Sequence, residues 1–381
     1  MEADPPFPFD RRVDRVREDC RSAGLDAVLV THPPNIRYLT GLAATAGAVV
    51  LTPTRCVLIA DFRYATAARD LIAARSPGTI ELEVPERGYD EAIVSVLRTC
   101  GAGRIGVEGA WLPVSRFNWL SSSLGSNAAD ETGRPNHPVT LIATERLIEA
   151  VRVIKDPSEI ARLREAARRL SSVGRQLGSF VREGRSERSV SGDIEAALRA
   201  AGFERPAFDT IVASGPNSAR PHARPEDRML QAGDGVVLDF GGVYDGYCVD
   251  LTRTLYVGVP HTALARIGRA VRQAHAAAVA AVRPGVRPSD IDGAARSVLA
   301  AHGLGEAFGH GTGHGLGLEV HEDPRITRLP SALPDTPVAP GMVFTIEPGA
   351  YVEGLGGVRI EDDILVVEDG CEVLTDVPIS N

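Results

Sequence analysis

Residues 238–254 read LDFGGVYDGYCVDLTRT, and this stretch sets the fold of the C-terminal part of the chain. An apolar run leads up to Asp239, and the dipeptide Asp245-Gly246 favours a tight hairpin turn. A hairpin folded about this turn brings Asp239 and Asp250 roughly opposite each other. Two carboxylates that face one another across a strand pair repel each other unless a cation lies between them. The stretch therefore predicts a β-hairpin that carries part of a cation site.

Each of these aspartates also has a structural explanation when it is taken alone. Asp239 fits a strand-end or capping role, and Asp250 could pair with Arg253 on the same strand. The two carboxylates together, on the two arms of one hairpin, favour the cation.

Residues 309–324 read GHGTGHGLGLEVHEDP and hold three of the nine histidines, His310, His314 and His321. The alternating glycines make a helix unfavourable here and let the backbone pass close to other groups. The segment lacks the HExxH pattern of helical zinc proteases, and no Gly-Lys-Ser/Thr follows, which argues against a phosphate-binding loop. A histidine-bearing loop is therefore expected.

Two glutamates stand in apolar, strand-like surroundings further on. Glu347 ends a β-rich run in residues 344–349, and Glu361 lies in a strand that continues through residues 364–367. A lone buried glutamate is costly, whereas several carboxylates that converge on a metal ion are not. Four carboxylates and one imidazole form an oxygen-rich site, which favours Mn²⁺, with Co²⁺, Zn²⁺ or Fe²⁺ as substitutes. So much negative charge predicts two divalent ions about 3.5–4 Å apart.

The N-terminal part of the chain alternates helix and strand patterns from about residue 10 to residue 144. Helices are expected over residues 11–22, 64–74 and 89–99, and strands over residues 25–30, 49–51, 56–60 and 104–108. This pattern predicts an α/β domain over residues 10–144. Residues 141–153 are expected to be a connecting segment.

The second domain is expected over residues 155–378 and to begin with a long helix. Asp156 is the predicted N-cap of this helix, with Pro157 at its first position. Further helices are expected over residues 187–201, 262–282 and 288–302, mixed with antiparallel strands from residue 208 onward.

Residues 101–106 read GAGRIG and match the GxGxxG pattern of dinucleotide-binding proteins. That fingerprint requires a strand before the glycines and a helix after them. Here a helical pattern precedes them and a strand pattern follows. The glycines are therefore expected to form a turn, and no dinucleotide site is predicted.

The composition sets limits on partners and location. The chain has 381 residues, a formal net charge of −9 and a hydrophobic fraction of 44%. The negative charge argues against nucleic acid or an anionic membrane as the main partner. No apolar stretch is long enough to span a bilayer, and residues 1–6 carry no secretory signal pattern. The five scattered cysteines are typical of reduced thiols, and a cytoplasmic location is expected.

The strings LDFGGVYDGYCVDLTRT, GHGLGLEVHEDP, TIEPG and GVRIEDD resemble successive signatures of the creatinase and methionine aminopeptidase superfamily, the pita-bread metallopeptidases of family M24. LDAVLVTHPPNIRYLTGL at residues 25–42 and DFRY at residues 61–64 look like its creatinase-type N-terminal domain. The resemblance implies an α/β creatinase-like domain followed by an α+β pita-bread catalytic domain. It also implies five metal ligands, which are Asp239, Asp250, His314, Glu347 and Glu361. In the family's pattern, Asp250 and Glu361 bridge both ions.

The resemblance further implies a peptidase acting on Xaa-Pro bonds, with a proline-containing peptide as substrate. Glu347 takes a proton from the attacking water, while His222 and His321 stabilise the oxyanion or hold the substrate. His310 and Arg359 match positions that orient ligands. For each of these histidines the alternative is a hydrogen-bonded core residue.

The favoured activity is that of Xaa-Pro aminopeptidase, known as aminopeptidase P, and the alternative is Xaa-Pro dipeptidase, known as prolidase. Arg325 falls where some prolidases place an arginine for the dipeptide's carboxylate, although it also fits a surface loop. Two alternative functions outside the metallopeptidases are a metal-free creatinase-like hydrolase and an inactive peptide-binding pita-bread protein. A homodimer is expected, because family members commonly dimerise and two-fold dimers are the commonest oligomers.

Overall fold

A computed structural model describes residues 7–75, 78–125, 139–328 and 335–379. The chain divides into two compact units, which meet in the sequence between Arg152 and Val153. Residues 1–6, on which the expectation of no secretory signal rests, lie outside the described residues. Within the described part, no helix is both long and apolar enough to cross a membrane.

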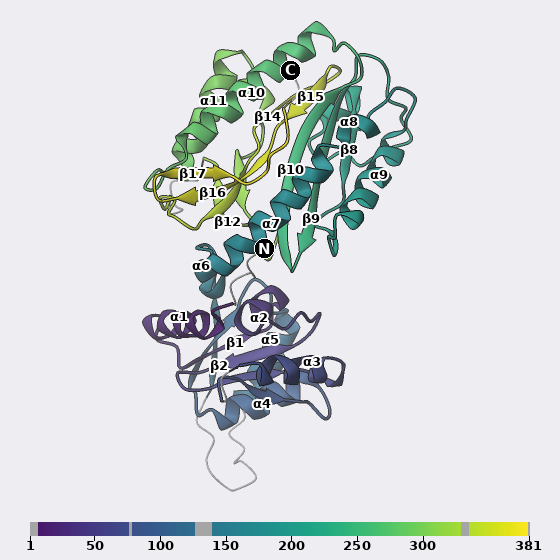
Figure 1. Cartoon of the computed structure of the whole chain (residues 1–381). Coiled ribbons are helices and arrows are strands. Elements are labelled where there is room, and N and C mark those ends of the chain that lie inside the picture. The colour runs from purple at the N-terminus through teal and green to yellow at the C-terminus, as the bar shows by residue number, and fades with distance from the viewer. Residues whose placement is uncertain (1–6, 76–77, 126–138, 329–334, 380–381) are drawn as a thin grey trace. The chain divides into compact units, whose positions relative to one another are not determined.

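The N-terminal unit is a mixed sheet with helices around it (Figure 1). Its strand order is β4-β3-β2-β1-β5-β6. Strands β1 to β3 pair antiparallel, whereas β5 and β6 continue the sheet in parallel with β1. The strands are β1 (Ala27–Val30), β2 (Ala48–Leu51), β3 (Cys56–Ile59), β4 (Glu81–Glu83), β5 (Arg104–Glu108) and β6 (Thr140–Thr144). The helices are α1 (Phe9–Ser22), α2 (Pro33–Thr40), α3 (Phe62–Ala73), α4 (Tyr89–Thr99), α5 (Val114–Gly125) and α6 (Leu147–Arg152).

The expected helices and strands of this unit are present, and the turn expected at the glycines of residues 101–106 is found at Gly101, while Gly106 lies within β5. Gly101 has φ +64° between α4 and β5, so a helix precedes the glycines and a strand follows. The prediction that residues 141–153 only connect the domains was wrong, because they contain most of β6 and all of α6. Strand β6 buries only Leu141 of its five residues and is held by its parallel pairing with β5.

The C-terminal unit is built around the predicted hairpin of β9 (Gly235–Tyr244) and β10 (Tyr247–Tyr256). Asp245 and Gly246 form its turn with φ of +43° and +77°, as the Asp-Gly signal predicts. The register pairs Asp239 with Thr252 and Asp250 with Gly241. The two aspartates are thus diagonal neighbours on one face, not directly opposite, and Asp239 lies inside β9 instead of at its end.

Helices flank the strands of this unit on two sides (Figure 1). On one side α7 packs on β9 and β10 and α9 packs on β8, and on the other α10 packs on α11 and β15. The helices are α7 (Pro157–Gly174), α8 (Leu177–Phe180), α9 (Glu187–Ala200), α10 (Thr262–Ala281) and α11 (Pro288–Ala301), with short 3₁₀ turns η1 (Gly215–Ala219) and η2 (Gly305–Ala307). Asp156 caps α7 by accepting the N–H groups of Ser158 and Glu159, which confirms the predicted N-cap.

The remaining strands form three groups. Strands β7 (Arg205–Pro206) and β8 (Ile211–Ser214) pair with β9. A five-stranded sheet has the order β12-β11-β13-β16-β17, and β14 pairs with β15. These strands are β11 (Gly313–Gly315), β12 (Glu322–Ile326), β13 (Val343–Ile346), β14 (Gly349–Val352), β15 (Gly356–Arg359), β16 (Asp362–Val367) and β17 (Gly370–Val373). Glu361 lies between β15 and β16, not within a strand as expected.

Candidate metal centre

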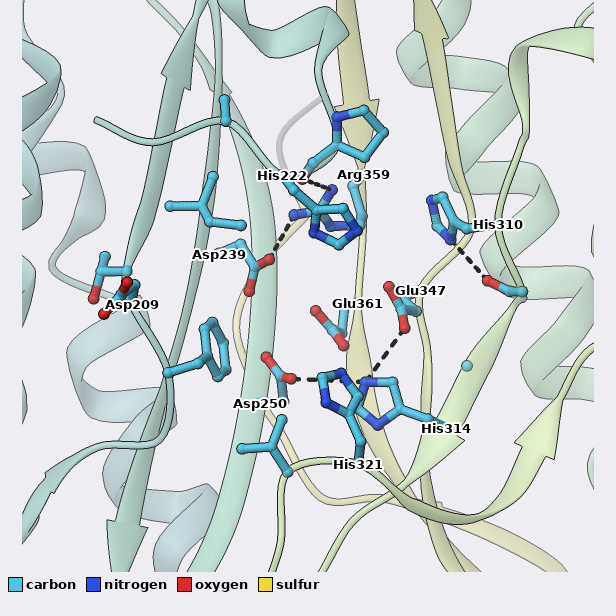
Figure 2. A pocket seen from close by; sticks show the side chains of 18 of the residues that line it. Asp209, His222, Asp239, Asp250, His310, His314, His321, Glu347, Arg359 and Glu361 are labelled. Atoms are coloured by element: carbon cyan, nitrogen blue, oxygen red, sulfur yellow. Dashed lines mark hydrogen bonds and ion pairs between the residues drawn. The ribbon is translucent and has the colours of Figure 1, made fainter. Parts of the chain in front are cut away.

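The five residues predicted as metal ligands line one cavity of about 540 Å³ in the C-terminal unit (Figure 2). Asp239 and Asp250 come from the hairpin, His314 from β11, Glu347 from the end of β13, and Glu361 from the β15–β16 connection. The other predicted site residues, His222, His310, His321, Arg325 and Arg359, line the same cavity. Residues spread over almost 140 positions are therefore gathered around one space.

His314 presents a neutral imidazole nitrogen to the carboxylates. Its Nδ1 lies 3.1 Å from the Gly315 carbonyl oxygen, which can only accept, so Nδ1 carries the proton. Burial lowers the pKa of His314 to about 3, so the ring is neutral near pH 7. The lone pair of Nε2 then lies 3.5 Å from Glu347 Oε1 and 4.0 Å from Asp250 Oδ2. Lone pairs facing each other at this range favour a cation between them.

Glycine on both sides of His314 allows this placement. A Cβ atom at Gly313 would lie 1.8 Å from the carbonyl oxygen of Thr345, on the neighbouring strand β13. A Cβ atom at Gly315 would lie 2.1 Å from the carbonyl oxygen of Asp323. Only glycine permits such close backbone approach, so these positions hold His314 where the strands converge.

Asp250 and Glu361 are buried carboxyl groups close to each other. Burial and then the neighbouring acidic groups raise the pKa values of both well above the ordinary range. Asp250 Oδ1 is buried without a hydrogen-bond partner, while Thr252 Oγ1 donates to Glu361 Oε2 at 2.6 Å. One ligand atom each from Asp250, His314 and Glu361 lies within 4.8 Å of the others. The donor set thus fits a divalent cation, which would offset this buried negative charge.

Arg359 connects Asp239 to His310 through hydrogen bonds to Asp239 and Tyr351. Its Nη2 donates to Asp239 Oδ2 at 2.6 Å, and its Nη1 donates to the Tyr351 hydroxyl at 2.8 Å. Tyr351 Oη lies 3.0 Å from His310 Nε2, and His310 Nδ1 donates to the Gly311 carbonyl at 2.8 Å. Burial lowers the pKa of His310 to about 4, so this ring is neutral and accepts from Tyr351. The chain of bonds orients the Asp239 carboxylate.

Two members of this network, Thr252 and Tyr351, were not anticipated from the sequence. Thr252 follows Asp250 by two positions in β10, so the alternation of a strand places both on one face and could have identified it. Tyr351 lies in the short strand β14, and its role depends on Arg359 and His310 from distant segments. No local pattern marks it.

His222, His321 and Arg325 lie toward the exposed part of the cavity. All three side chains are exposed to solvent, in contrast to His314. The ring of His321 packs edge-on against that of His314, with 4.3 Å between the ring centroids. Partial desolvation of the His321 ring by its surroundings, followed by the charge of Arg325, lowers the pKa of its imidazole. These residues are placed to touch a molecule that enters the cavity.

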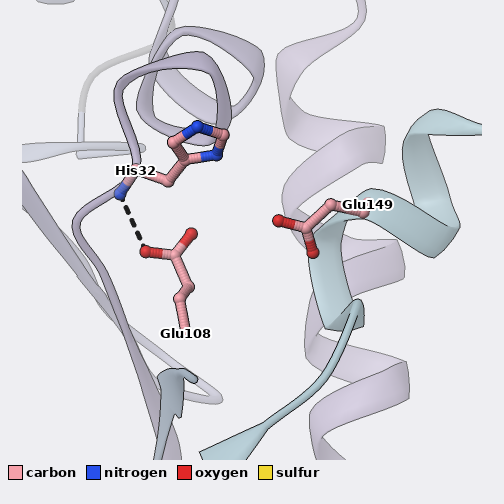
Figure 3. A group of neighbouring side chains, drawn as sticks. All are labelled: His32, Glu108 and Glu149. Carbon is pink, nitrogen blue, oxygen red and sulfur yellow. Dashed lines mark hydrogen bonds between the residues drawn. The ribbon is translucent and has the colours of Figure 1, made fainter. Parts of the chain in front are cut away.

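A second acidic cluster, His32, Glu108 and Glu149, lies in the N-terminal unit (Figure 3). Glu108 accepts the backbone N–H groups of Thr31 and His32 and the side-chain amide of Asn35. The His32 ring is stacked on Trp111 with 3.6 Å between centroids. Glu108 therefore acts as an acceptor for donors at the start of α2, which accounts for its burial without a metal ion.

Glu347 gives the metal-free protein a pH-dependent stability that can be measured. Burial raises its pKa to about 7 in the folded protein, against 4.5 in the unfolded chain. Its contribution to stability is present at pH 4.5 and is lost as the pH rises through 7, because the ionised group is disfavoured in the folded state. We expect metal-free Glu347→Gln to exceed the wild type in unfolding free energy by up to about 3 kcal/mol at pH 8. At pH 5 the same relation leaves a difference of only about 0.8 kcal/mol.

Urea denaturation after chelation, at pH 5 and pH 8, measures this difference. Glu372→Gln is the matched control, because Glu372 pairs with Arg164 on the surface, where solvent screens the charge. A Glu347→Gln variant that gains no stability between pH 5 and pH 8 would contradict the assignment of a buried ionisable carboxyl.

Comparison with known proteins assigns each of the two units to a known protein family. Residues 161–368 match metallopeptidase family M24, and residues 12–154 match the creatinase/prolidase N-terminal domain. The chain is 32% identical over 369 residues to the Xaa-Pro dipeptidase of Pyrococcus horikoshii, which covers 96% of this chain and 97% of the relative.

Two solved structures superpose on almost the whole chain. The Xaa-Pro dipeptidase from Bacillus anthracis has a TM-score of 0.89 and 35% identity, covering 98% of this chain and 99% of that one. The X-Pro aminopeptidase from Thermotoga maritima has a TM-score of 0.82 and 31% identity, covering 95% and 99%. The fold is thus shared by proteins described as dipeptidases and by proteins described as aminopeptidases.

Proposed function

This chain belongs to metallopeptidase family M24, with the pita-bread fold and a creatinase-type N-terminal domain, and on that premise we propose that it is an Xaa-Pro dipeptidase. The observation that carries the metal-dependent hydrolysis in this proposal is the approach of Asp250, His314 and Glu361, which each place one ligand atom within 4.8 Å of the others. The sequence favoured aminopeptidase P, but the relatives support the alternative better, because several of them are described as Xaa-Pro dipeptidases or prolidases.

The proposed cofactor is a pair of divalent ions, with Mn²⁺ favoured by the oxygen-rich donor set. The residues that would hold it are Asp239, Asp250, His314, Glu347 and Glu361. When bound, such ions lower the pKa of a water molecule and polarise the scissile carbonyl group. The buried, unpartnered Asp250 Oδ1 and the lone pair of His314 Nε2 support this assignment.

Glu347 is the proposed general base and acid. Its Oε1 lies 3.5 Å from His314 Nε2 and its side chain lines the cavity, so it can reach a water molecule held among the proposed ligands. It accepts a proton from the attacking water and delivers it to the proline nitrogen that leaves. Thr345 Oγ1, 3.4 Å from Glu347 Oε1, helps to hold the carboxylate in place.

His222 and His321 are proposed to act on the substrate from the exposed part of the cavity. Both line it without being among the proposed ligands, so their rings are available to donate to the oxygen of the scissile carbonyl as charge develops there. Arg359 and His310 keep Asp239 and Tyr351 in fixed orientations. A metal-free hydrolase or an inactive binding protein would have no need for the full donor set.

Arg325 is proposed to bind the free carboxylate of the dipeptide. It lines the cavity from β12, where its backbone pairs with His314. We expect Arg325→Ala to lower kcat/KM for an Xaa-Pro dipeptide by about 10- to 100-fold, mainly through KM, because a charge-assisted bond is lost. Wild-type protein should cleave Xaa-Pro-Xaa tripeptides far more slowly than the dipeptide.

Steady-state kinetics on both substrates at a fixed Mn²⁺ concentration test this assignment. Arg328→Ala is the control, because Arg328 is a neighbouring exposed arginine that does not line the cavity. Efficient cleavage of the tripeptide by the wild type would favour aminopeptidase P and overturn the dipeptidase assignment.

The proposed assembly is a homodimer, which sedimentation would test directly.

A further inference from the structure

The chain contains a single lysine, Lys155, among 41 basic residues. The other basic residues are all arginine, and most of them lie at least partly exposed, whereas Lys155 is 3% exposed. A lysine ammonium is compact and offers three donors, while a guanidinium is larger and planar. Lys155 lies just before α7, at the start of the C-terminal unit.

Lys155 forms a buried ion pair with Glu322, the residue that follows His321. Its Nζ lies 3.1 Å from Glu322 Oε2, and the two side chains are 1% and 8% exposed. The backbone N–H of Lys155 donates to the Gly341 carbonyl at 2.9 Å, so the residue is held at its backbone as well as at its ammonium. Removal of one partner from a buried pair leaves an uncompensated charge, so loss of the Lys155 ammonium would favour movement of the Glu322 carboxylate toward solvent.

Glu322 in turn organises the loop of residues 317–322. Its Oε1 accepts the backbone N–H of Glu319 at 3.0 Å. Its carboxylate packs against Gly317, where a Cβ atom would lie only 2.9 Å from Oε2. The loop is closed by the Gly317 N–H, which donates to the Glu319 carbonyl at 3.0 Å. The Glu322 carboxylate therefore contacts both Gly317 and Glu319 and stabilises the conformation of this loop.

This loop carries His321 into the cavity, next to His314. We propose that Lys155 is a positioning residue, which acts through Glu322 and the loop of residues 317–322 to hold His321 against the substrate. Lys155 itself does not line the cavity. The inference rests on the proposed function, because it assumes that His321 assists hydrolysis there.

A double-mutant cycle tests the inference, with Lys155→Met, His321→Ala and both substitutions together. We expect Lys155→Met to lower kcat/KM for an Xaa-Pro dipeptide by about 10- to 100-fold, because a small displacement of an acting group is costly. In the His321→Ala background the same substitution should change kcat/KM by less than about twofold, since residues acting through one another are not additive. Bound Mn²⁺ should be unchanged in all three variants.

Arg228→Met is the matched control, because Arg228 forms a part-buried ion pair with Asp234 in the same unit and does not line the cavity. It should alter kcat/KM by less than about twofold. If Lys155→Met does not fold, Glu322→Gln enters the cycle instead, since it keeps the size of the side chain. Equal losses in both backgrounds, no loss in the wild-type background, or no effect of His321→Ala would each overturn the inference.

Hydrogen exchange separates this inference from the proposed function. The Glu319 amide should exchange about tenfold faster in Lys155→Met than in the wild type, because its acceptor is released. Unchanged exchange at Glu319 would overturn the positioning role whatever the activity. Failure of the wild type to cleave any Xaa-Pro substrate, with faster exchange in the variant, would overturn the dipeptidase assignment while the Lys155–Glu322 link to the loop is upheld.

Discussion

Replacing Glu361 by alanine is expected to abolish hydrolysis and the binding of transition metal together. Glu361 is 2% exposed, its Oε2 accepts from Thr252, and it shares a point in the cavity with Asp250 and His314. Loss of this buried carboxylate would remove part of the negative charge that is proposed to hold the metal ions. Metal analysis should show a fall from about two equivalents to less than about one, and kcat should drop below detection.

The control for this experiment is Glu353→Ala, an exposed glutamate beyond β14, which should keep both metal and activity. Exhaustive chelation of the wild type should reproduce the inactivity of Glu361→Ala, and added Mn²⁺ should restore only the wild type. Full activity after chelation would instead favour a metal-free creatinase-like hydrolase. Full metal content in Glu361→Ala would remove Glu361 from the proposed ligand set.

Replacing Glu347 by glutamine is expected to lower kcat for Xaa-Pro hydrolysis by about 10²- to 10⁴-fold. Glutamine keeps the size of the side chain and an oxygen that can still bind a metal ion, but it cannot accept a proton. KM should change little, because the lost interaction belongs to the transition state. Steady-state kinetics with a saturated metal site measure the change.

The same variant should be more stable than the wild type at pH 8 when metal is absent, since it lacks a buried carboxylate. Lower activity with higher stability separates loss of proton transfer from damage to the fold. A fall in kcat smaller than about tenfold would show that another group carries the proton.

The N-terminal sheet and the hairpin illustrate what local sequence can predict. Apolar runs identified β1, β2, β3 and β5, and the helical pattern over residues 89–99 matches α4 at both ends. The Asp245-Gly246 turn and the Asp156 cap were also predicted, because their causes lie within a few residues. Strand β6 and helix α6 were missed, since little of β6 is buried and its pairing with β5 is a long-range contact.

The donor types, the hairpin that carries two of them, and the glycines that flank His314 can all be recognised in the amino-acid sequence. These features follow from side-chain chemistry and from backbone preferences over a few residues. Long-range packing places Asp239 and Asp250 diagonally across the hairpin, and it brings Arg359 to Asp239 across 120 positions and Lys155 to Glu322 across 167. Such contacts depend on how whole strands and helices pack, because no local preference specifies which distant groups meet.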